Sequence, residues 1–155
     1  MRYNESYNNI FKETFDKKYM VEQLGIIGYG IVGQAVTYGF RDYHPIHIYD
    51  KFKSDISQSL EEVVEKSDIL FICLPTPMNK EQTGIDLAII DAAIASIASQ
   101  TKETDKVITI KSTVVPGTTR AYVERYPEMN FAFNPEFLTE ANYLDDFVHA
   151  DRHVV

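Results

Sequence analysis

Three glycines near the start of the chain have the spacing of a nucleotide-binding turn. Gly28, Gly30 and Gly33 form a G-x-G-x-x-G pattern directly after the apolar run Leu24–Ile27. In such a turn the first glycine allows a tight bend, the second lets the backbone approach a pyrophosphate, and the third lets a helix pack closely on a strand. The helix that follows directs N–H groups and a partial positive charge at phosphate. The spacing therefore predicts a dinucleotide site, provided that the rest of the chain supplies the matching fold.

A carboxylate in the next segment fits the same site. Asp50 lies 17 positions beyond Gly33, at the end of a second apolar run. An acidic residue at this place accepts hydrogen bonds from the adenosine ribose hydroxyls and repels a 2′-phosphate, which favours NAD over NADP. Lys51 and Lys53 weaken that preference, because a nearby cation could accommodate a phosphate. The alternative is an aspartate that only caps a turn at the end of its strand.

Two later apolar runs also end in polar or turn-forming residues. The segment Pro75-Thr76-Pro77 follows the most apolar run of the chain, and its prolines fix the backbone there. It is either a rigid exit from the sheet or a support that holds the threonine against a cofactor. Ser112 and Thr113 follow the next run and place hydroxyls at the same edge. A purely helix-capping role fits Thr118 better than Thr113.

Two carboxylates lie four residues apart in the segment Asn134-Pro135-Glu136-Phe137-Leu138-Thr139-Glu140. Carboxylates beside a cofactor can act as a general base or orient a water molecule. The alternative for Glu140 is an ordinary acidic residue in the first turn of a helix that Thr139 caps.

The elements that must position these residues alternate along the chain. The apolar patterns predict strands at 21–27, 46–50, 68–74, 106–111 and 130–133, and helices at 31–43, 59–66, 86–100, 118–125 and from Thr139 onward. Residues 1–20 form an N-terminal extension whose apolar spacing predicts a helix, packed on the domain or binding a partner.

Alternating strands and helices predict an α/β fold: a Rossmann-like, doubly wound, mainly parallel sheet with helices on both faces. Ligands of such sheets bind outside the carboxyl ends of the strands. The glycine turn and the polar segments described above all follow strand ends, so we expect them to meet at one edge.

The composition limits the classes of partner that the chain can bind. The 155 residues carry a formal net charge of -8, which argues against nucleic acid or an anionic membrane as a partner. Cys73 is the only cysteine, so no disulfide forms within the chain, and no metal site is expected. No apolar run is long enough for a membrane span and no secretory signal is present, so we expect the reducing cytoplasm.

The ordered set of motifs resembles the NAD-binding domain of the UDP-glucose/GDP-mannose dehydrogenase family, the nucleotide-sugar 6-dehydrogenases. The resemblance covers about residues 22–155. The matching segments are Gly28-Tyr29-Gly30-Ile31-Val32-Gly33, Leu74-Pro75-Thr76-Pro77, Lys111-Ser112-Thr113, Pro116-Gly117-Thr118-Thr119, Asn134-Pro135-Glu136-Phe137-Leu138-Thr139-Glu140 and Asp151-Arg152.

The resemblance implies an enzyme that oxidises the C6 alcohol of a nucleotide-sugar to a carboxylate with two NAD, through a thiohemiacetal and a thioester on a cysteine. The implied catalytic residues are Thr113, Glu136 and Glu140. The implied substrate contacts are Glu136, Phe137, Leu138 and Glu140. The implied cofactor contacts are Gly28, Tyr29, Gly30, Ile31, Val32, Gly33, Asp50, Lys51, Pro75, Thr76, Ser112, Thr113 and Glu140.

The chain also departs from this family. The family's nucleophilic cysteine lies in later domains, so we expect a truncated chain in which residues 21–155 form the NAD-binding domain, the central and nucleotide-sugar domains are absent, and catalysis is incomplete. A homo-oligomer or a second polypeptide would then complete the site. The segment 51–58 is too short for a parallel crossover, so the edge strand after the second strand is expected to be reduced or missing. Two alternatives remain: a β-hydroxyacid dehydrogenase-type domain and a non-catalytic NAD-binding or assembly module.

Overall fold

The computed structural model describes residues 21–101, 105–152 and 154–155, which alternate between strands and helices. The strands are β1 (Leu24–Ile27), β2 (Ile46–Tyr49), β3 (Ile69–Ile72), β4 (Val107–Ile110) and β5 (Asn130–Phe133). The helices are α2 (Ile31–Phe40), α3 (Leu60–Lys66), α4 (Ala88–Gln100), α5 (Thr118–Arg125) and α6 (Tyr143–Val148). The helix predicted within residues 1–20 lies outside the described residues. None of the helices in the described ranges is long and apolar enough to cross a membrane.

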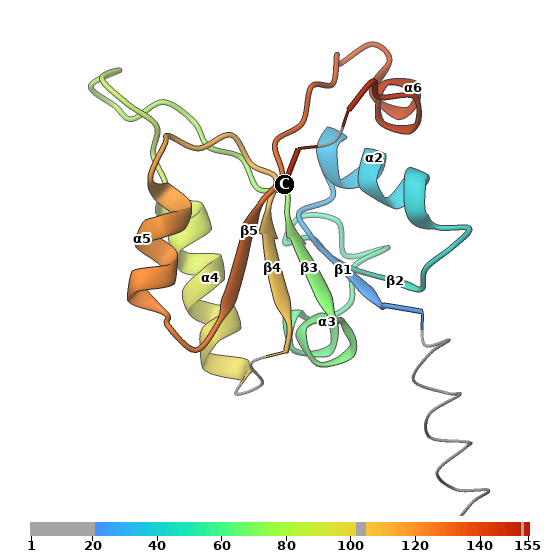
Figure 1. The fold of residues 1–155 in the computed structure, drawn as a ribbon, viewed down its shortest axis with the longest axis horizontal. Coiled ribbons are helices and arrows are strands. Elements are labelled where there is room, and N and C mark those ends of the chain that lie inside the picture. Colours follow the sequence, from blue (N-terminus) through green and yellow to red (C-terminus); the bar gives the residue numbers. More distant parts are fainter. Residues whose placement is uncertain (1–20, 102–104, 153) are drawn as a thin grey trace, which may run out of the picture.

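All strands of the described residues form one parallel sheet in the order β2-β1-β3-β4-β5. The chain runs outward from β1 to β2, crosses back to β3 and then continues in the opposite direction (Figure 1). The topological switch point therefore lies between β1 and β3, where open α/β sheets bind their ligands. The predicted α/β, Rossmann-like class is confirmed.

The strand ends lie in one row across the sheet. Pairing in register links the last residues of the five strands: Tyr49, Ile27, Ile72, Ile110 and Phe133. The residues that follow them along the edge are Asp50, Gly28, Cys73, Lys111 and Asn134. The expectation that the polar segments meet at one edge of the sheet follows directly from this register.

Helices cover both faces of the sheet (Figure 1). Alternate residues along β3 and just after it show the division: Leu70 and Ile72 pack with helices α3, α4 and α5, whereas Phe71 and Cys73 pack with α2 and α6. Each such buried apolar side chain contributes about 1.5–3 kcal/mol relative to an exposed one. This two-sided burial explains why β3 is apolar without interruption.

The predicted loss of an edge strand is confirmed. Between β2 and α3 the chain forms turns instead of a strand. The Gln58 amide donates a hydrogen bond to the Ile48 carbonyl (2.8 Å), and the Asp50 amide donates to Ser57 Oγ (2.9 Å). The returning segment thus satisfies backbone groups at the open edge of β2. It then enters α3 through a capping box between Ser59 and Glu62.

The prediction that Thr139 caps the last helix, with Glu140 in its first turn, is wrong. Helix α6 begins at Tyr143, after Asn142. The amide and the hydroxyl of Thr139 both donate to Asp146 Oδ2, at 2.7 and 2.6 Å. A carboxylate from inside α6 therefore binds the threonine, and Glu140 lies in an exposed turn before the helix.

Candidate cofactor site

The glycine turn between β1 and α2 has the geometry that its spacing predicts. Gly28 has a φ of +96°, and a Cβ there would lie 2.6 Å from the Cys73 carbonyl oxygen. A Cβ on Gly33 would collide with the carbonyl oxygen of Gly28. Side chains are therefore excluded at both positions, by the backbone conformation at the first and by helix–turn packing at the second.

Gly30 differs from the other two glycines because it faces open space. A Cβ placed on it would meet no atom of the described residues within 4 Å. Gly30 is the N-cap of the ten-residue helix α2, and it has no side chain to cover the N–H groups of the first turn. An open position beside a helix N-terminus fits a pyrophosphate.

Asp50 lies against this turn. Its Oδ2 accepts a hydrogen bond from the Tyr29 amide (2.7 Å), and its Oδ1 accepts one from the Phe52 amide (2.8 Å). Lys53 Nζ donates to the Tyr29 carbonyl (2.7 Å) and lies 5.5 Å from the centre of the tyrosine ring. Asp50 thus caps a turn and contacts the glycine turn at the same time. Its role as a ribose contact stays a prediction. Lys51 is exposed, with Nζ 5.9 Å from the Phe52 ring centre.

Ser112 shapes the chain that leaves β3. Its hydroxyl accepts a hydrogen bond from the Leu74 amide (2.9 Å) and lies 2.7 Å from the Leu74 carbonyl oxygen, to which it donates. This buried hydroxyl fixes the start of the segment that carries Pro75 and Thr76. Thr113 is exposed at the same edge. Thr118 donates its hydroxyl to the Val115 carbonyl (2.8 Å), as expected for a local structural role.

The segment after β5 borders a small pocket. Glu136, Phe137 and Leu138 line it together with Lys111, which follows β4, and with residues of α6. Glu136 Oε2 is buried and has no hydrogen-bond partner among the described residues. Burial raises the pKa of this carboxyl, and the nearby Lys111 ammonium opposes that rise. Glu140, four residues further, does not line this pocket, and Phe137 is 64% exposed.

Lys111 also lines this pocket, although it is not among the site residues predicted from the sequence. It is only 3% exposed, and its Nζ donates to Asn134 Oδ1 at 2.8 Å and to the Asn134 carbonyl oxygen at 3.3 Å. Burial lowers the pKa of the Lys111 ammonium, whereas Cys73 and Glu136 oppose that shift. The signal in the sequence was a lysine placed directly after an apolar run and before two hydroxyl residues.

Cys73 is the only thiol of the chain and lies in the core. Burial raises its pKa to about 12. A thiol of this kind stays protonated at neutral pH, and the thiolate is the nucleophile. Cys73 is therefore a packing residue, as expected from its place within an apolar run.

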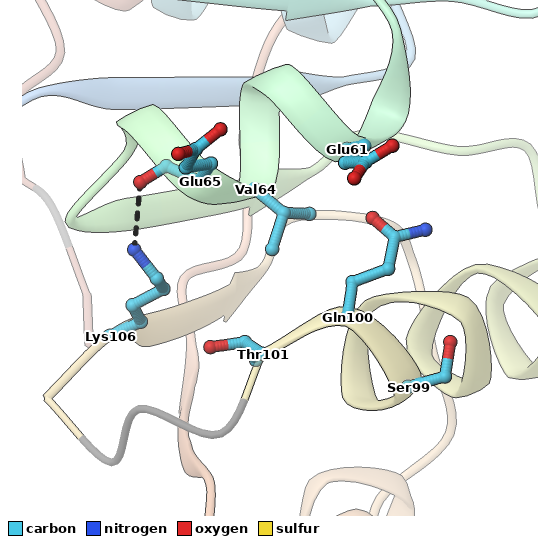
Figure 2. A pocket seen from close by; sticks show the side chains of 7 residues that line it. All are labelled: Glu61, Val64, Glu65, Ser99, Gln100, Thr101 and Lys106. Carbon is cyan, nitrogen blue, oxygen red and sulfur yellow. Dashed lines mark hydrogen bonds between the residues drawn. The ribbon is translucent and has the colours of Figure 1, made fainter.

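A wider hollow of about 630 Å³ lies at the opposite edge of the sheet. Glu61, Val64 and Glu65 of α3 face the end of α4 and the start of β4 across it, and Lys106 Nζ donates to the Glu65 carbonyl at 3.3 Å (Figure 2). None of the predicted site residues lines this hollow. The amino edge of the sheet thus carries a structural lysine contact, and the residues with candidate chemistry lie at the carboxyl edge.

The sheet order, the glycine turn and the acidic residue after β2 define a Rossmann-like dinucleotide-binding domain. Residues 46–155 match the NAD binding domain of the UDP-glucose/GDP-mannose dehydrogenase family. The chain therefore belongs to this family and corresponds to its NAD-binding domain. The match begins at β2, so the glycine turn precedes it and is identified by its own geometry.

Relatives with known names agree with this assignment. The chain is 35% identical to UDP-glucose 6-dehydrogenase of Rickettsia bellii, over 61% of this chain and 22% of that protein. It is 28% identical to UDP-glucose 6-dehydrogenase AglM of Haloferax volcanii, over 86% of this chain and 40% of that protein. The fold is similar to that of GDP-mannose dehydrogenase from Pseudomonas aeruginosa, with a TM-score of 0.65 and 21% identity, over 81% of this chain and 38% of that structure. The chain spans less than half the length of each of these proteins.

Proposed function

We propose that this chain is the cofactor-binding part of a nucleotide-sugar 6-dehydrogenase, which oxidises a C6 alcohol to a carboxylate with NAD. The observation that carries the proposal is the single row of strand ends, which places the glycine turn, Asp50 and the Glu136 segment along one edge. Membership of the family and relatives named UDP-glucose 6-dehydrogenase support it. The substrate class is accordingly a nucleotide-sugar such as UDP-glucose.

The proposed cofactor contacts divide between backbone and side chains. The open space at Gly30 and the N–H groups of α2 would hold the pyrophosphate, and Asp50 would accept hydrogen bonds from the ribose. Bound NAD supplies the hydride acceptor. The other proposed contacts are Gly28, Tyr29, Ile31, Val32, Gly33, Lys51, Pro75, Thr76, Ser112, Thr113 and Glu140. Among them, Ser112 acts through the backbone of the Leu74–Thr76 segment, because its hydroxyl is engaged with Leu74.

Glu136 has the surroundings of a general base. A carboxyl whose pKa is raised by burial accepts a proton more readily near neutral pH than an exposed one. We assign it, with Thr113 and Glu140, to the positioning or activation of water. Phe137 and Leu138 would border the sugar, since they line the same pocket as Glu136.

The covalent step needs a nucleophilic thiol that Cys73 cannot supply, because its thiol is buried and protonated. We propose that residues 21–155 form one NAD-binding domain, that residues 1–20 are an extension, and that the nucleophile comes from outside these residues. A homo-oligomer or a second polypeptide would bring the remaining groups. A chain with one buried cysteine fits the reducing cytoplasm.

The test is incubation of the purified chain with NAD and UDP-glucose, with NADH followed by absorbance. We expect NAD binding without steady turnover, and activity once a polypeptide with the family's cysteine domain is added. Steady formation of two NADH per sugar by the chain alone would overturn the assignment of an external nucleophile. A chain that binds neither NAD nor NADP would instead favour a non-catalytic assembly module.

A further inference from the structure

Lys111 is a buried cation at the centre of the carboxyl edge. It follows β4 directly, is 3% exposed, and its Nζ lies 5.6 Å from the centre of the Phe147 ring of α6. Lysine is almost never buried to this degree without a partner, because removing an ammonium from water is costly. Its direct partner is one residue of the neighbouring strand end, Asn134.

Asn134 connects Lys111 to two further parts of the chain. Its Oδ1 and its carbonyl oxygen both accept from Lys111 Nζ, and its Nδ2 donates to the Val154 carbonyl at 2.5 Å. These bonds fix which way the amide points. They also fix the residue from which the chain turns into Pro135 and Glu136.

Glu136 lies two residues after Asn134 and borders the same pocket as Lys111. Its Oε2 is buried yet has no hydrogen-bond donor within the described part of the chain. The groups of other elements that line the same pocket are Lys111 after β4, Asp146 of α6 and Arg152 near the end of the chain, and Cys73 after β3 lies close enough to interact with Lys111. Asp146 is engaged by Thr139 and Arg152 is exposed, whereas Lys111 is buried, so Lys111 is the buried cation among these residues.

We propose that Lys111 is a positioning residue of the site: through Asn134 it fixes the turn that carries Glu136, and its ammonium lies in the same pocket as that carboxyl and supplies a compensating charge. This inference rests on the proposed role of Glu136 in the site. Lys111 does not contact cofactor or substrate in this account. It acts by holding Glu136 in place and in its ionised form.

The test compares Lys111→Met, which keeps length and removes charge, with Lys111→Arg, which keeps charge. The control Lys106→Met removes a lysine that binds the Ser67 and Glu65 carbonyls at the opposite edge. The titration of Glu136 is followed by NMR of 13C-labelled glutamate, with Glu136→Gln to assign the signal.

We expect the Glu136 midpoint to rise by about one pH unit in Lys111→Met, in the range of a lost neighbouring charge. It should stay close to the wild-type value in Lys111→Arg and in Lys106→Met. An unchanged Glu136 midpoint in folded Lys111→Met would overturn the proposal, and so would a rise of the same size in Lys106→Met.

A reciprocal measurement covers the case in which Lys111→Met does not fold. In Glu136→Gln the Lys111 ammonium loses a facing negative charge, so its own midpoint, followed by 13C NMR at Cε, should fall. No fall would contradict the proposal. Titration of the wild-type chain with NAD separates this inference from the proposed function. A shifted Glu136 midpoint in Lys111→Met without NAD binding by the wild type would contradict the proposed function alone. NAD binding without that shift would contradict this inference alone.

Discussion

The two ends of the carboxyl edge differ in how far their polar groups are satisfied. At the glycine turn, the amide and the carbonyl of Tyr29 are bonded to Asp50 and Lys53, and both carboxylate oxygens of Asp50 accept backbone hydrogen bonds. At the other end, Glu136 keeps a buried oxygen without a partner among the residues described. The polar groups of the first end are thus already paired within the chain. The second holds a group whose partner would arrive with substrate, water or another polypeptide.

The difference has a structural cause. The glycine turn is built from contacts between β1, α2 and the turn after β2, which the sheet register fixes. The Glu136 segment is held by side-chain hydrogen bonds on either side of it, from Lys111 to Asn134 and from Thr139 to Asp146. Buried polar groups without partners are costly, so the unpaired oxygen of Glu136 calls for an explanation.

The largest expected effect is at the glycine turn. Gly33→Val places a side chain against the Gly28 carbonyl and should lower the free energy of unfolding by about 3 kcal/mol, the upper part of the usual range for overpacking. Urea denaturation measures this. The matched change Gly30→Ala enters open space and should cost less than about 1 kcal/mol at this N-cap position. Equal losses for the two variants would contradict the packing described for the turn.

The next largest effect on stability is expected at Ser112, which lies between the glycine turn and the Glu136 segment along the carboxyl edge. Ser112→Ala leaves the partly buried Leu74 amide without its acceptor and should cost about 1–3 kcal/mol. Thr113→Ala, at the adjacent exposed position, is the control and should leave the unfolding free energy within about 0.5 kcal/mol of the wild type. Thermal unfolding of both variants gives the comparison. A neutral Ser112→Ala would show that the hydroxyl does not hold the β3 exit.

Asp50→Asn tests the cofactor end of the carboxyl edge. Loss of the charged acceptor should weaken NAD binding by about 10- to 100-fold, the equivalent of a hydrogen bond to a charged group. It should also narrow the preference for NAD over NADP, because the charge that repels a 2′-phosphate is gone. Asp55→Asn, an exposed aspartate in the same turn region, is the matched control and should bind NAD as the wild type does. Calorimetric titration with both cofactors measures these affinities.

The smallest effect is a pH dependence at the other end. The folded chain raises the Glu136 pKa above its usual 4.5, so the unfolded state loses this proton first. The free energy of unfolding contributed by Glu136 is therefore fully present below about 4.5 and falls as the pH rises through the raised pKa. Glu136→Gln should remove this fall in denaturation curves taken from pH 4 to 8.

Asp146 supplies the matched control, because its pKa is lowered by hydrogen bonds from Thr139. Its contribution is present above its usual 3.8 and is lost as the pH falls through the lowered pKa. Asp146→Asn should therefore change the pH dependence in the opposite sense, in curves extended below pH 3.8. Parallel curves for the two variants would contradict the electrostatic description of this end.

Much of the fold was predictable because its signals are local. The apolar patterns gave the bounds of α5 and β5 as observed, and the short segment 51–58 predicted the missing edge strand. The start of α6 was not predictable from Thr139, since a carboxylate seven residues further along binds its amide and hydroxyl.

The candidate site, like the fold, was predictable only where its signals are visible in the sequence. The glycine spacing and Asp50 are visible in the sequence, and they meet because parallel strands end at one edge. The burial of Lys111 and its bonds to Asn134 depend on residues 23 positions apart in the sequence, and no local pattern reveals them. The buried oxygen of Glu136 likewise becomes evident only once the strands and α6 are packed together.

The most direct test of the central claim is a calorimetric titration of the chain with NAD, repeated with Gly30→Ala. The account predicts saturable binding by the wild type, with one NAD per chain, and strongly weakened binding by a Gly30→Ala variant that unfolds at nearly the same denaturant concentration. A wild-type chain that binds neither NAD nor NADP, or a Gly30→Ala variant that binds NAD as tightly as the wild type, would contradict it.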